Sequence, residues 1–312
     1  MGFLYLTAST ILPSWFLKRR SLAVGIASSG AGFGGLAYNL GTGAAVESLG
    51  LAWTYRLLAL STLLVNASCS LLLKERKKTT RPKQKMFSWS EFAQMQVILV
   101  IIWGFATELG YIVLLYSLPN YAISIGLTAK QGSIVGAVLN LGLAFGRPAV
   151  GYWSDRFGRI NIAMLMTALC GVFCLGLWVP AKSYAVLLVF ALASGTVTGT
   201  FWGCVVPVTA EVVGMARLSS AFGMICLPLV LPTTFAEPIA LALKDASGYL
   251  TSQIFVGIMF LLGAISMWAL RCWKIWELET KQMRERDAEE LGGVRHGAIW
   301  LTPRRMFLLQ KV

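Results

Sequence analysis

The stretch NLGLAFGRPAVGYWSDRFGRIN, from Asn140 to Asn161, guides the interpretation of the rest of the chain. It begins as an apolar, glycine-spaced run that contains one arginine, Arg147, and it becomes polar at Ser154. An arginine that is retained within a long apolar segment is a candidate functional residue, because an unpaired guanidinium is costly to place there. The stretch therefore predicts an apolar helix with a functional arginine, followed by a short polar turn.

The composition of the whole chain indicates a membrane protein. Its 312 residues are 56% hydrophobic and 13% charged, with a mean hydropathy of +0.68, whereas a soluble domain carries about 25% charged residues. The formal net charge is +13, but the basic residues lie between apolar runs, which is typical of cytoplasmic loops and not of a nucleic-acid-binding groove. We expect an all-α, polytopic membrane protein with the lipid bilayer, and no nucleic acid, as a partner.

The apolar runs predict about nine spanning helices of about 20 residues each. We expect these helices over residues 2–17, 21–46, 52–73, 95–119, 130–153, 160–179, 183–208, 218–243 and 250–270. The expected domains are a partial N-terminal bundle over 1–73, a basic linker over 74–94, a six-helix C-terminal bundle over 95–271 and a tail over 272–312. Arginines in the linker, the 154–159 turn and the tail place these segments, and the C-terminus, on the cytoplasmic side.

No pattern in the sequence predicts catalysis. The six cysteines lie in or at the ends of apolar runs and the sole histidine, His296, lies in the tail, so neither a metal-type spacing nor a nucleophile–base pair is found. We expect the cysteines to be small packing residues. The chain is therefore predicted to be no enzyme, with no catalytic residue, cofactor or metal.

The turn that ends the opening stretch carries a specific motif. It follows the pattern G-x-x-x-D-R-x-G-R, with Gly151, Asp155, Arg156, Gly158 and Arg159 at the defined positions. This pattern resembles the cytoplasmic-loop signature of the major facilitator superfamily of solute transporters. The resemblance implies two six-helix bundles that are related by an axis along the membrane normal.

A second motif, WFLKRRSLAVGIASSG over Trp15–Gly30, is similar to a signature of the monocarboxylate transporter family. The segment Tyr111–Trp178 resembles fungal members of that family in particular. The family's helix count implies that three helices are missing before the first span. The resemblance also implies a multi-pass protein, in the plasma membrane in preference to the vacuolar membrane.

Two functions are compatible with these resemblances. The first is secondary active transport of a small organic solute by alternating access, either of a carboxylate-type compound or as efflux of a secondary metabolite, with protons as a candidate coupling ion. The second is a truncated family member without independent transport activity. Many animal relatives carry an aspartate one turn before the arginine, where this chain has Leu143, and this difference argues against simple monocarboxylates.

Four polar residues in apolar runs are candidates for the substrate or proton site. Arg147 is expected to bind a substrate carboxylate through bidentate hydrogen bonds; the alternatives are a snorkelling or structurally paired arginine. Asn140 is expected to share its face, or to make a helix-packing hydrogen bond. Glu108 and Glu237 are candidate proton sites, but the interpretation that we favour is that they line a water-filled outer vestibule.

Glycine pairs four residues apart predict close helix packing. We expect the two bundles to meet along pairs in the second and fifth helices, namely Gly30 and Gly34, Gly132 and Gly136, and Gly142 and Gly146. We also expect Asp155 to act as a latch, by pairing with the positive N-terminus of the helix that begins at Ser21 and with the basic cluster Lys18, Arg19 and Arg20.

Overall fold

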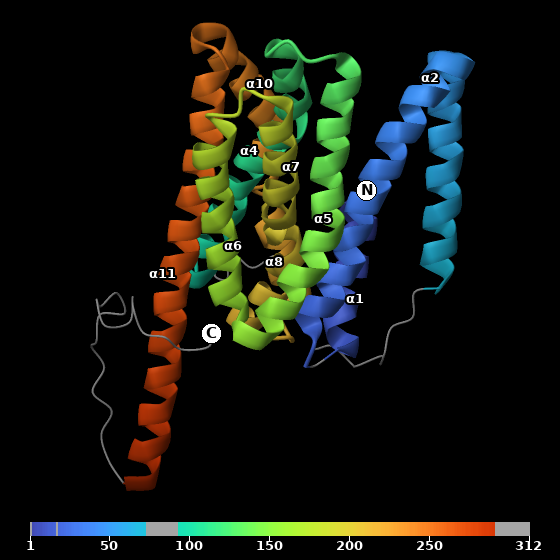
Figure 1. Ribbon diagram of the computed structural model, residues 1–312. Helices are drawn as coiled ribbons and strands as arrows, with labels where there is room; N and C mark the ends of the chain where they lie inside the picture. Colours follow the sequence, from blue (N-terminus) through green and yellow to red (C-terminus); the bar gives the residue numbers. More distant parts are fainter. Residues whose placement is uncertain (1, 17, 73–92, 291–312) are drawn as a thin grey trace.

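The computed structural model describes residues 2–16, 18–72 and 93–290, and all the regular structure within them is helical (Figure 1). Seven helices in the described residues are long and apolar enough to cross a membrane. Six of these seven come from residues 95–283. The predicted all-α, multi-pass membrane fold is thus confirmed. Most of the expected linker and the end of the tail, residues 73–92 and 291–312, lie outside the described residues.

The first two elements are α1 (Gly2–Trp15) and α2 (Arg20–Leu72). Helix α1 has 14 residues, so its length of about 21 Å is less than a hydrocarbon core of about 30 Å. Helix α2 is two helices joined at Gly50, whose φ of 78° is readily adopted only by glycine. Its second arm, from Ser48, lies at the edge of the molecule in Figure 1, with none of its apolar window buried.

The remaining helices pack into one bundle (Figure 1). They are α4 (Met95–Ser124), α5 (Ala129–Phe157), α6 (Arg159–Phe173) with its π-helical extension η1 (Cys174–Trp178), α7 (Tyr184–Thr198), α8 (Thr200–Val213), α9 (Leu218–Cys226), α10 (Val230–Ser247) and α11 (Tyr249–Glu290). Large side chains fill the middle of this bundle, where Trp103, Phe201 and Phe260 are buried. The indole of Trp103 also donates a hydrogen bond of 3.1 Å to the hydroxyl of Thr167.

Two of the expected spans are each formed by two shorter helices. One span divides into α7 and α8 at Gly199, and the other divides into α9 and α10 around Pro228. Proline has no N–H to donate and clashes with the preceding turn, so Pro228 and Pro232 account for the second break. Pro207 and Pro238, by contrast, lie inside α8 and α10.

The first part of the expected tail, residues 272–290, is helical. It is the direct continuation of the last spanning helix, because α11 runs unbroken for 42 residues and extends beyond the end of the bundle where α5 meets α6 (Figure 1). Glu277 pairs with Lys274 at 2.7 Å and with Lys281 at 2.8 Å, and pairs at these spacings favour helix. No glycine or proline lies between 270 and 290 to end it.

The first arm of α2 packs along α5 with a face of small residues. The residues on this face are Ser21, Gly25, Ser28, Gly32 and Gly35, which follow each other at alternating spacings of four and three. Helix α5 presents an antiparallel row against them, made of Asp155, Gly151, Arg147, Ala144 and Asn140. We call this contact the α2–α5 seam. Its spacing is that of helices packed in a left-handed pair.

The glycine pairs that we expected in the α2–α5 seam do not face it. An added Cβ would meet nothing within 4 Å at Gly30 or Gly34, whereas at Gly32 it would lie 2.7 Å from the carbonyl oxygen of Asn140. On α5, Gly132 and Gly136 face Pro119 of α4, and Gly142 and Gly146 face Gly195 and Thr196 of α7. The prediction was therefore wrong about the partner: a four-residue glycine spacing indicates a close approach, but not which helix makes it.

Replacing Gly32 by alanine should weaken the seam, because the added methyl group meets backbone atoms that cannot move aside. We expect a loss of about 1–3 kcal/mol, as for other overpacked contacts, seen as a lower midpoint in thermal unfolding of the purified chain. Gly30→Ala, two residues earlier on the same helix, is the matched control. It should leave stability unchanged or raise it by up to about 1 kcal/mol through helix propensity. Equal effects of the two substitutions would contradict this description of the seam.

Candidate functional site

The seam places the guanidinium of Arg147 between the first helices and the bundle. Arg147 is 5% exposed, and its Nη1 donates a hydrogen bond of 2.6 Å to the backbone carbonyl of Ser28 on α2. Because Gly25 has no side chain, the backbone of α2 comes close enough for this contact. The Nε atom of Arg147 is buried and has no hydrogen-bond partner. The site therefore contains a charged donor with unused capacity.

The space for this guanidinium comes from the break between α7 and α8. A Cβ added to Gly199 would lie 2.5 Å from Nε of Arg147 and 2.6 Å from the side chain of Leu143. The residue at the break must therefore be glycine for the arginine to keep this position. A helix break that faces a buried charge is typical of membrane proteins, in which irregular backbone lines functional sites.

Glu108 on α4 lies close to the same point. It is 1% exposed, its carboxylate faces the indole of Trp202 as a hydrogen-bond partner, and it is within electrostatic range of Arg147. Its Oε1 has no hydrogen-bond partner. Three residues further along α4, Tyr111 lies within electrostatic range of the Arg147 guanidinium. We call Glu108, Tyr111, Arg147 and Trp202 the central cluster.

The two glutamates therefore lie in different surroundings. The expectation that Glu108 lines a water-filled vestibule is wrong, because Glu108, like Gly104, lies on the side of α4 that is buried in the bundle. Glu237 on α10 is half-buried and faces Ser117 of α4. Ser117 is nine residues from Glu108, about 13 Å along the helix, so Glu237 is not part of the central cluster.

Asn140 lies in the seam. It is buried, its Nδ2 donates a hydrogen bond of 2.9 Å to the carbonyl of Gly136 in its own helix, and its Oδ1 packs against Gly35 of α2. It does share the α2-facing side of α5 with Arg147, as expected. Its hydrogen bond stays within α5, so it does not join two helices as the packing alternative expected, although the side chain does pack against α2.

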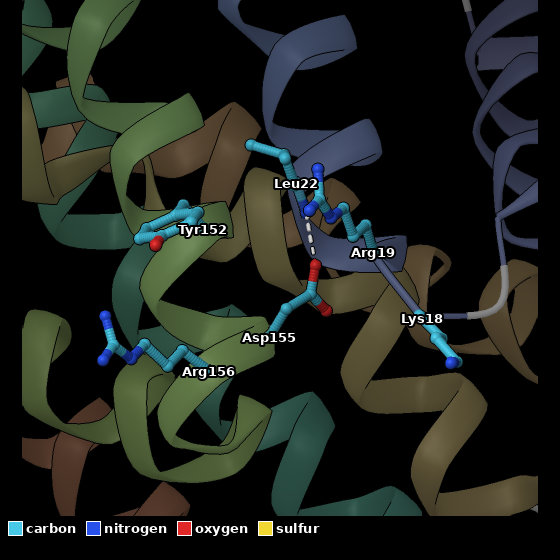
Figure 2. A pocket seen from close by; sticks show the side chains of 6 residues that line it. All are labelled: Lys18, Arg19, Leu22, Tyr152, Asp155 and Arg156. Atoms are coloured by element: carbon cyan, nitrogen blue, oxygen red, sulfur yellow. Dashed lines mark hydrogen bonds between the residues drawn. The ribbon is translucent and has the colours of Figure 1, made fainter.

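At the far end of the seam, Asp155 caps the first turn of α2. Its two carboxylate oxygens accept hydrogen bonds from the backbone N–H groups of Ser21, at 3.1 Å, and Leu22, at 2.9 Å (Figure 2). A carboxylate at this position satisfies orphan N–H groups and interacts favourably with the helix dipole. This is the contact with the N-terminus of the second helix that a latch requires.

Arg159 connects this cap to the rest of the bundle. Its guanidinium lies 3.4 Å from Asp155 and 3.5 Å from Glu211 of α8, and its Nε donates to the hydroxyl of Ser21 at 3.2 Å. Gly158, with a φ of 104°, makes the sharp turn that brings Arg159 back beside Asp155. Gly151 allows the backbone of α2 to pass, since an added Cβ would lie 2.9 Å from the carbonyl carbon of Ser21. Each motif residue except Arg156 thus has a part in the cap.

Several site residues were not identified from the sequence. Tyr111, Trp202 and Gly199 are far apart along the chain, and no local pattern connects them with Arg147. The small face of α2 did have a signal, namely small residues at alternating spacings of four and three from Ser21 to Gly35. In the part of the chain that the structure describes, no group of three His, Cys, Asp or Glu residues that could hold a metal is found.

These features define a polytopic transporter-type fold, with a buried charged cluster between packed helices and a capped turn at one end. The family model of the Major Facilitator Superfamily matches residues 1–225 and 104–310 of the chain. The chain therefore belongs to the Major Facilitator Superfamily, as the turn motif indicated. Its relatives are transporters and not enzymes, and members of the superfamily bind small-molecule substrates.

The comparisons also find similar individual proteins. The chain is 30% identical over 304 residues to the probable transporter MCH2 of Saccharomyces cerevisiae, covering 93% of this chain and 64% of MCH2. It is 31% identical to the uncharacterized transporter ESBP6 of the same yeast, over 88% of this chain and 43% of ESBP6. The chain thus spans less than two thirds of the length of these relatives. It is also 26% identical to the fujikurins efflux protein of Gibberella fujikuroi, over 84% of this chain and 57% of that protein.

A solved structure is similar in fold. The crystal structure of the fucose:proton symporter FucP of E. coli superposes with a TM-score of 0.67 and 13% sequence identity, over 85% of this chain and 73% of FucP. At this identity the similarity establishes the fold alone.

Replacing Asp155 by asparagine should loosen the cap, because one acceptor oxygen and the negative charge are lost. We expect a shift of about 1–3 kcal/mol toward the state in which this end is open, or about 5- to 150-fold in the equilibrium. Cys204, which is buried beside Ser154 and Asp155, reports this opening through faster alkylation by a small thiol reagent, in a background with the less buried Cys69 and Cys226 replaced by alanine. Asp245→Asn, an exposed carboxylate in α10, is the control. An unchanged alkylation rate in Asp155→Asn would contradict a latch.

Proposed function

We propose that this chain transports a small organic anion by alternating access, and that Arg147 binds the anion. The observation that carries this proposal is the buried guanidinium in the seam, whose Nε has no hydrogen-bond partner. A buried charge is costly unless it is paired, so its retention is explained if a substrate supplies the missing acceptor. Carboxylate is the group that suits an arginine best, because it accepts two parallel hydrogen bonds.

The surroundings of Arg147 leave room for such a partner. Its guanidinium donates to the neutral carbonyl of Ser28, and among the described residues no carboxylate forms an ion pair with it. Glu108 lies within electrostatic range but makes no ion pair. The Glu108 carboxylate thus leaves the guanidinium of Arg147 free to bind an anion. Protonation of Glu108 would remove a nearby negative charge and raise the affinity for the anion, which would couple proton binding to anion binding.

The movement that we propose takes place at the seam. Residues 1–73 and 95–271 would form the two moving parts, and residues 74–94 their linker. The small side chains of Gly25, Ser28, Gly32 and Gly35 offer a smooth surface for one part to rock on the other, and the Asp155 cap would close the cytoplasmic end. This orientation also places the C-terminus in the cytoplasm, and we infer that the plasma membrane is the site of action.

The proposed substrate class is supported by the relatives and by one sequence difference. We infer that the chain is a fungal-type member of the monocarboxylate transporter family, since relatives include yeast transporters and proteins named for efflux of fujikurins and agnestins. Leu143 replaces the aspartate that many animal relatives have, and its side chain packs beside Gly199 and the arginine. An apolar neighbour favours an anion with an apolar body, such as an aromatic or extended organic acid, over lactate.

Replacing Arg147 by glutamine should lower anion affinity about 10- to 100-fold, the value of one or two charged hydrogen bonds. Arg147→Lys should recover only part of this loss, because the ammonium group cannot make the bidentate contact. The measurement is calorimetric titration of the purified chain with benzoate, lactate and citrate, and uptake into proteoliposomes. Arg56→Gln, an exposed arginine on the second arm of α2, is the control. Anion binding that is equal in wild type and Arg147→Gln would refute the role of Arg147, and binding without uptake would favour a family member that lacks independent transport.

Replacing Glu108 by glutamine should separate proton coupling from binding. The amide keeps the size of the side chain, so anion binding should persist, while stimulation of uptake by a pH gradient should be lost. Glu237→Gln, the half-buried glutamate outside the central cluster, is the matched control and should keep the stimulation. If Glu237→Gln abolishes it and Glu108→Gln does not, the proton site is on α10.

A further inference from the structure

A pocket of about 250 Å³ lies at the Asp155 end of the seam (Figure 2). One wall belongs to the segment that leads into α2, and the other belongs to the last turns of α5. The lining residues are Lys18, Arg19 and Leu22 on the first wall and Tyr152, Asp155 and Arg156 on the second. The pocket thus bridges the two parts that we propose to move.

Within the described residues, the cations that line this pocket make no ion pair. Lys18, Arg19 and Arg156 are exposed, and among the described residues no acidic partner is found for any of them; Arg156 only lies over the ring of Phe157, at 5.6 Å. The carboxylate in the pocket is already satisfied, because Asp155 accepts from two backbone N–H groups and pairs with Arg159. The pocket therefore presents three free cations and has no comparable free anion.

The two segments that form the pocket carry exposed aromatic side chains. Tyr152 lines the pocket. Trp15, Phe16, Trp153 and Phe157, which lie close to the lining residues in the sequence, are like Tyr152 between 45% and 55% exposed. Aromatic side chains that stay exposed at the end of spanning helices are typical of the membrane–water interface. This position suits a ligand with an anionic head, which contacts the cations, and with apolar chains that stay in the bilayer.

We infer that this pocket binds the headgroup of an anionic phospholipid of the cytoplasmic leaflet. Basic pockets between spanning helices on the cytoplasmic side suit such headgroups, and anionic lipids are concentrated in that leaflet. Because its cations come from both walls, the lipid binds most tightly when the walls are close together. It therefore stabilises the state in which the Asp155 end is closed, by its difference in affinity for the two states. This effect of the lipid on the closed state rests on the proposed alternating access.

The test compares the full chain in phosphatidylcholine nanodiscs with and without phosphatidylserine. Phosphatidylserine should raise the midpoint of thermal unfolding, and native mass spectrometry should detect bound phosphatidylserine. The triple variant Lys18→Gln/Arg19→Gln/Arg156→Gln should lose about a hundredfold in lipid affinity, since each basic residue contributes about fivefold. The double variant Lys130→Gln/Lys182→Gln removes exposed charges from the other end of the bundle and should respond as the wild type does.

The outcomes are distinct. A triple variant that keeps the full response to phosphatidylserine overturns the site, and so does an equal response to inorganic phosphate, which would assign the pocket to a free anion. Alkylation of Cys204 tests the effect of the lipid on the closed state, because phosphatidylserine should slow alkylation in the wild type and not in the triple variant. Lipid binding without slower alkylation overturns the conformational effect alone, and loss of anion transport in Arg147→Gln bears on the proposed function and not on this pocket.

Discussion

The close approach of α2 to α5 is the contact on which the site depends. A row of small residues, from Ser21 to Gly35, lets two helix backbones meet where ordinary side chains would hold them apart. Within a bilayer such packing replaces the hydrophobic effect as the force that joins helices, because lipid chains are as apolar as leucine. The same approach brings polar backbone groups of α2 within reach of side chains on α5. The same helix contact therefore provides both the packing and the hydrogen bonds between α2 and α5.

Arg147 and Asp155 show both uses of this approach. They lie eight residues apart on α5, about 12 Å along the axis, and both point at α2. Arg147 donates to a carbonyl in the middle of the helix, where partners are few, and Asp155 accepts from N–H groups at its start, where they are always available. Any movement that separates α2 from α5 at one end must change the surroundings of both residues. One continuous helix, with Pro148 inside it, thus connects the central cluster to the cap.

The buried charged groups in and beside the seam differ in how fully they are paired. Asp155, Arg159 and Glu211 satisfy one another at the Asp155 end, whereas Arg147 and Glu108 in the centre each keep a buried atom without a hydrogen-bond partner. In a structure where most buried polar groups are bonded, such exceptions need a reason. Binding of a transient ligand would explain these unpaired atoms, because polar groups that are fully hydrogen-bonded within the protein cannot also bind a ligand tightly. The completed pairs stabilise the structure, and the incomplete ones are the groups that we propose to bind an anion and a proton.

The sequence by itself determined the class of the protein and several of its contacts. Apolar run length and the spread of basic residues predicted the spanning helices, and the motif at Gly151–Arg159 predicted the family and the cap, because these properties are local in the chain. Only the tertiary structure decided which helices the glycines face, that Glu108 lies inside and faces Trp202, and that Tyr111 and the Gly199 break lie near Arg147. The period of a helix shows which residues share a face, but not which of several apolar helices will cover it. That choice depends on the fit of whole surfaces, which no short stretch of sequence contains.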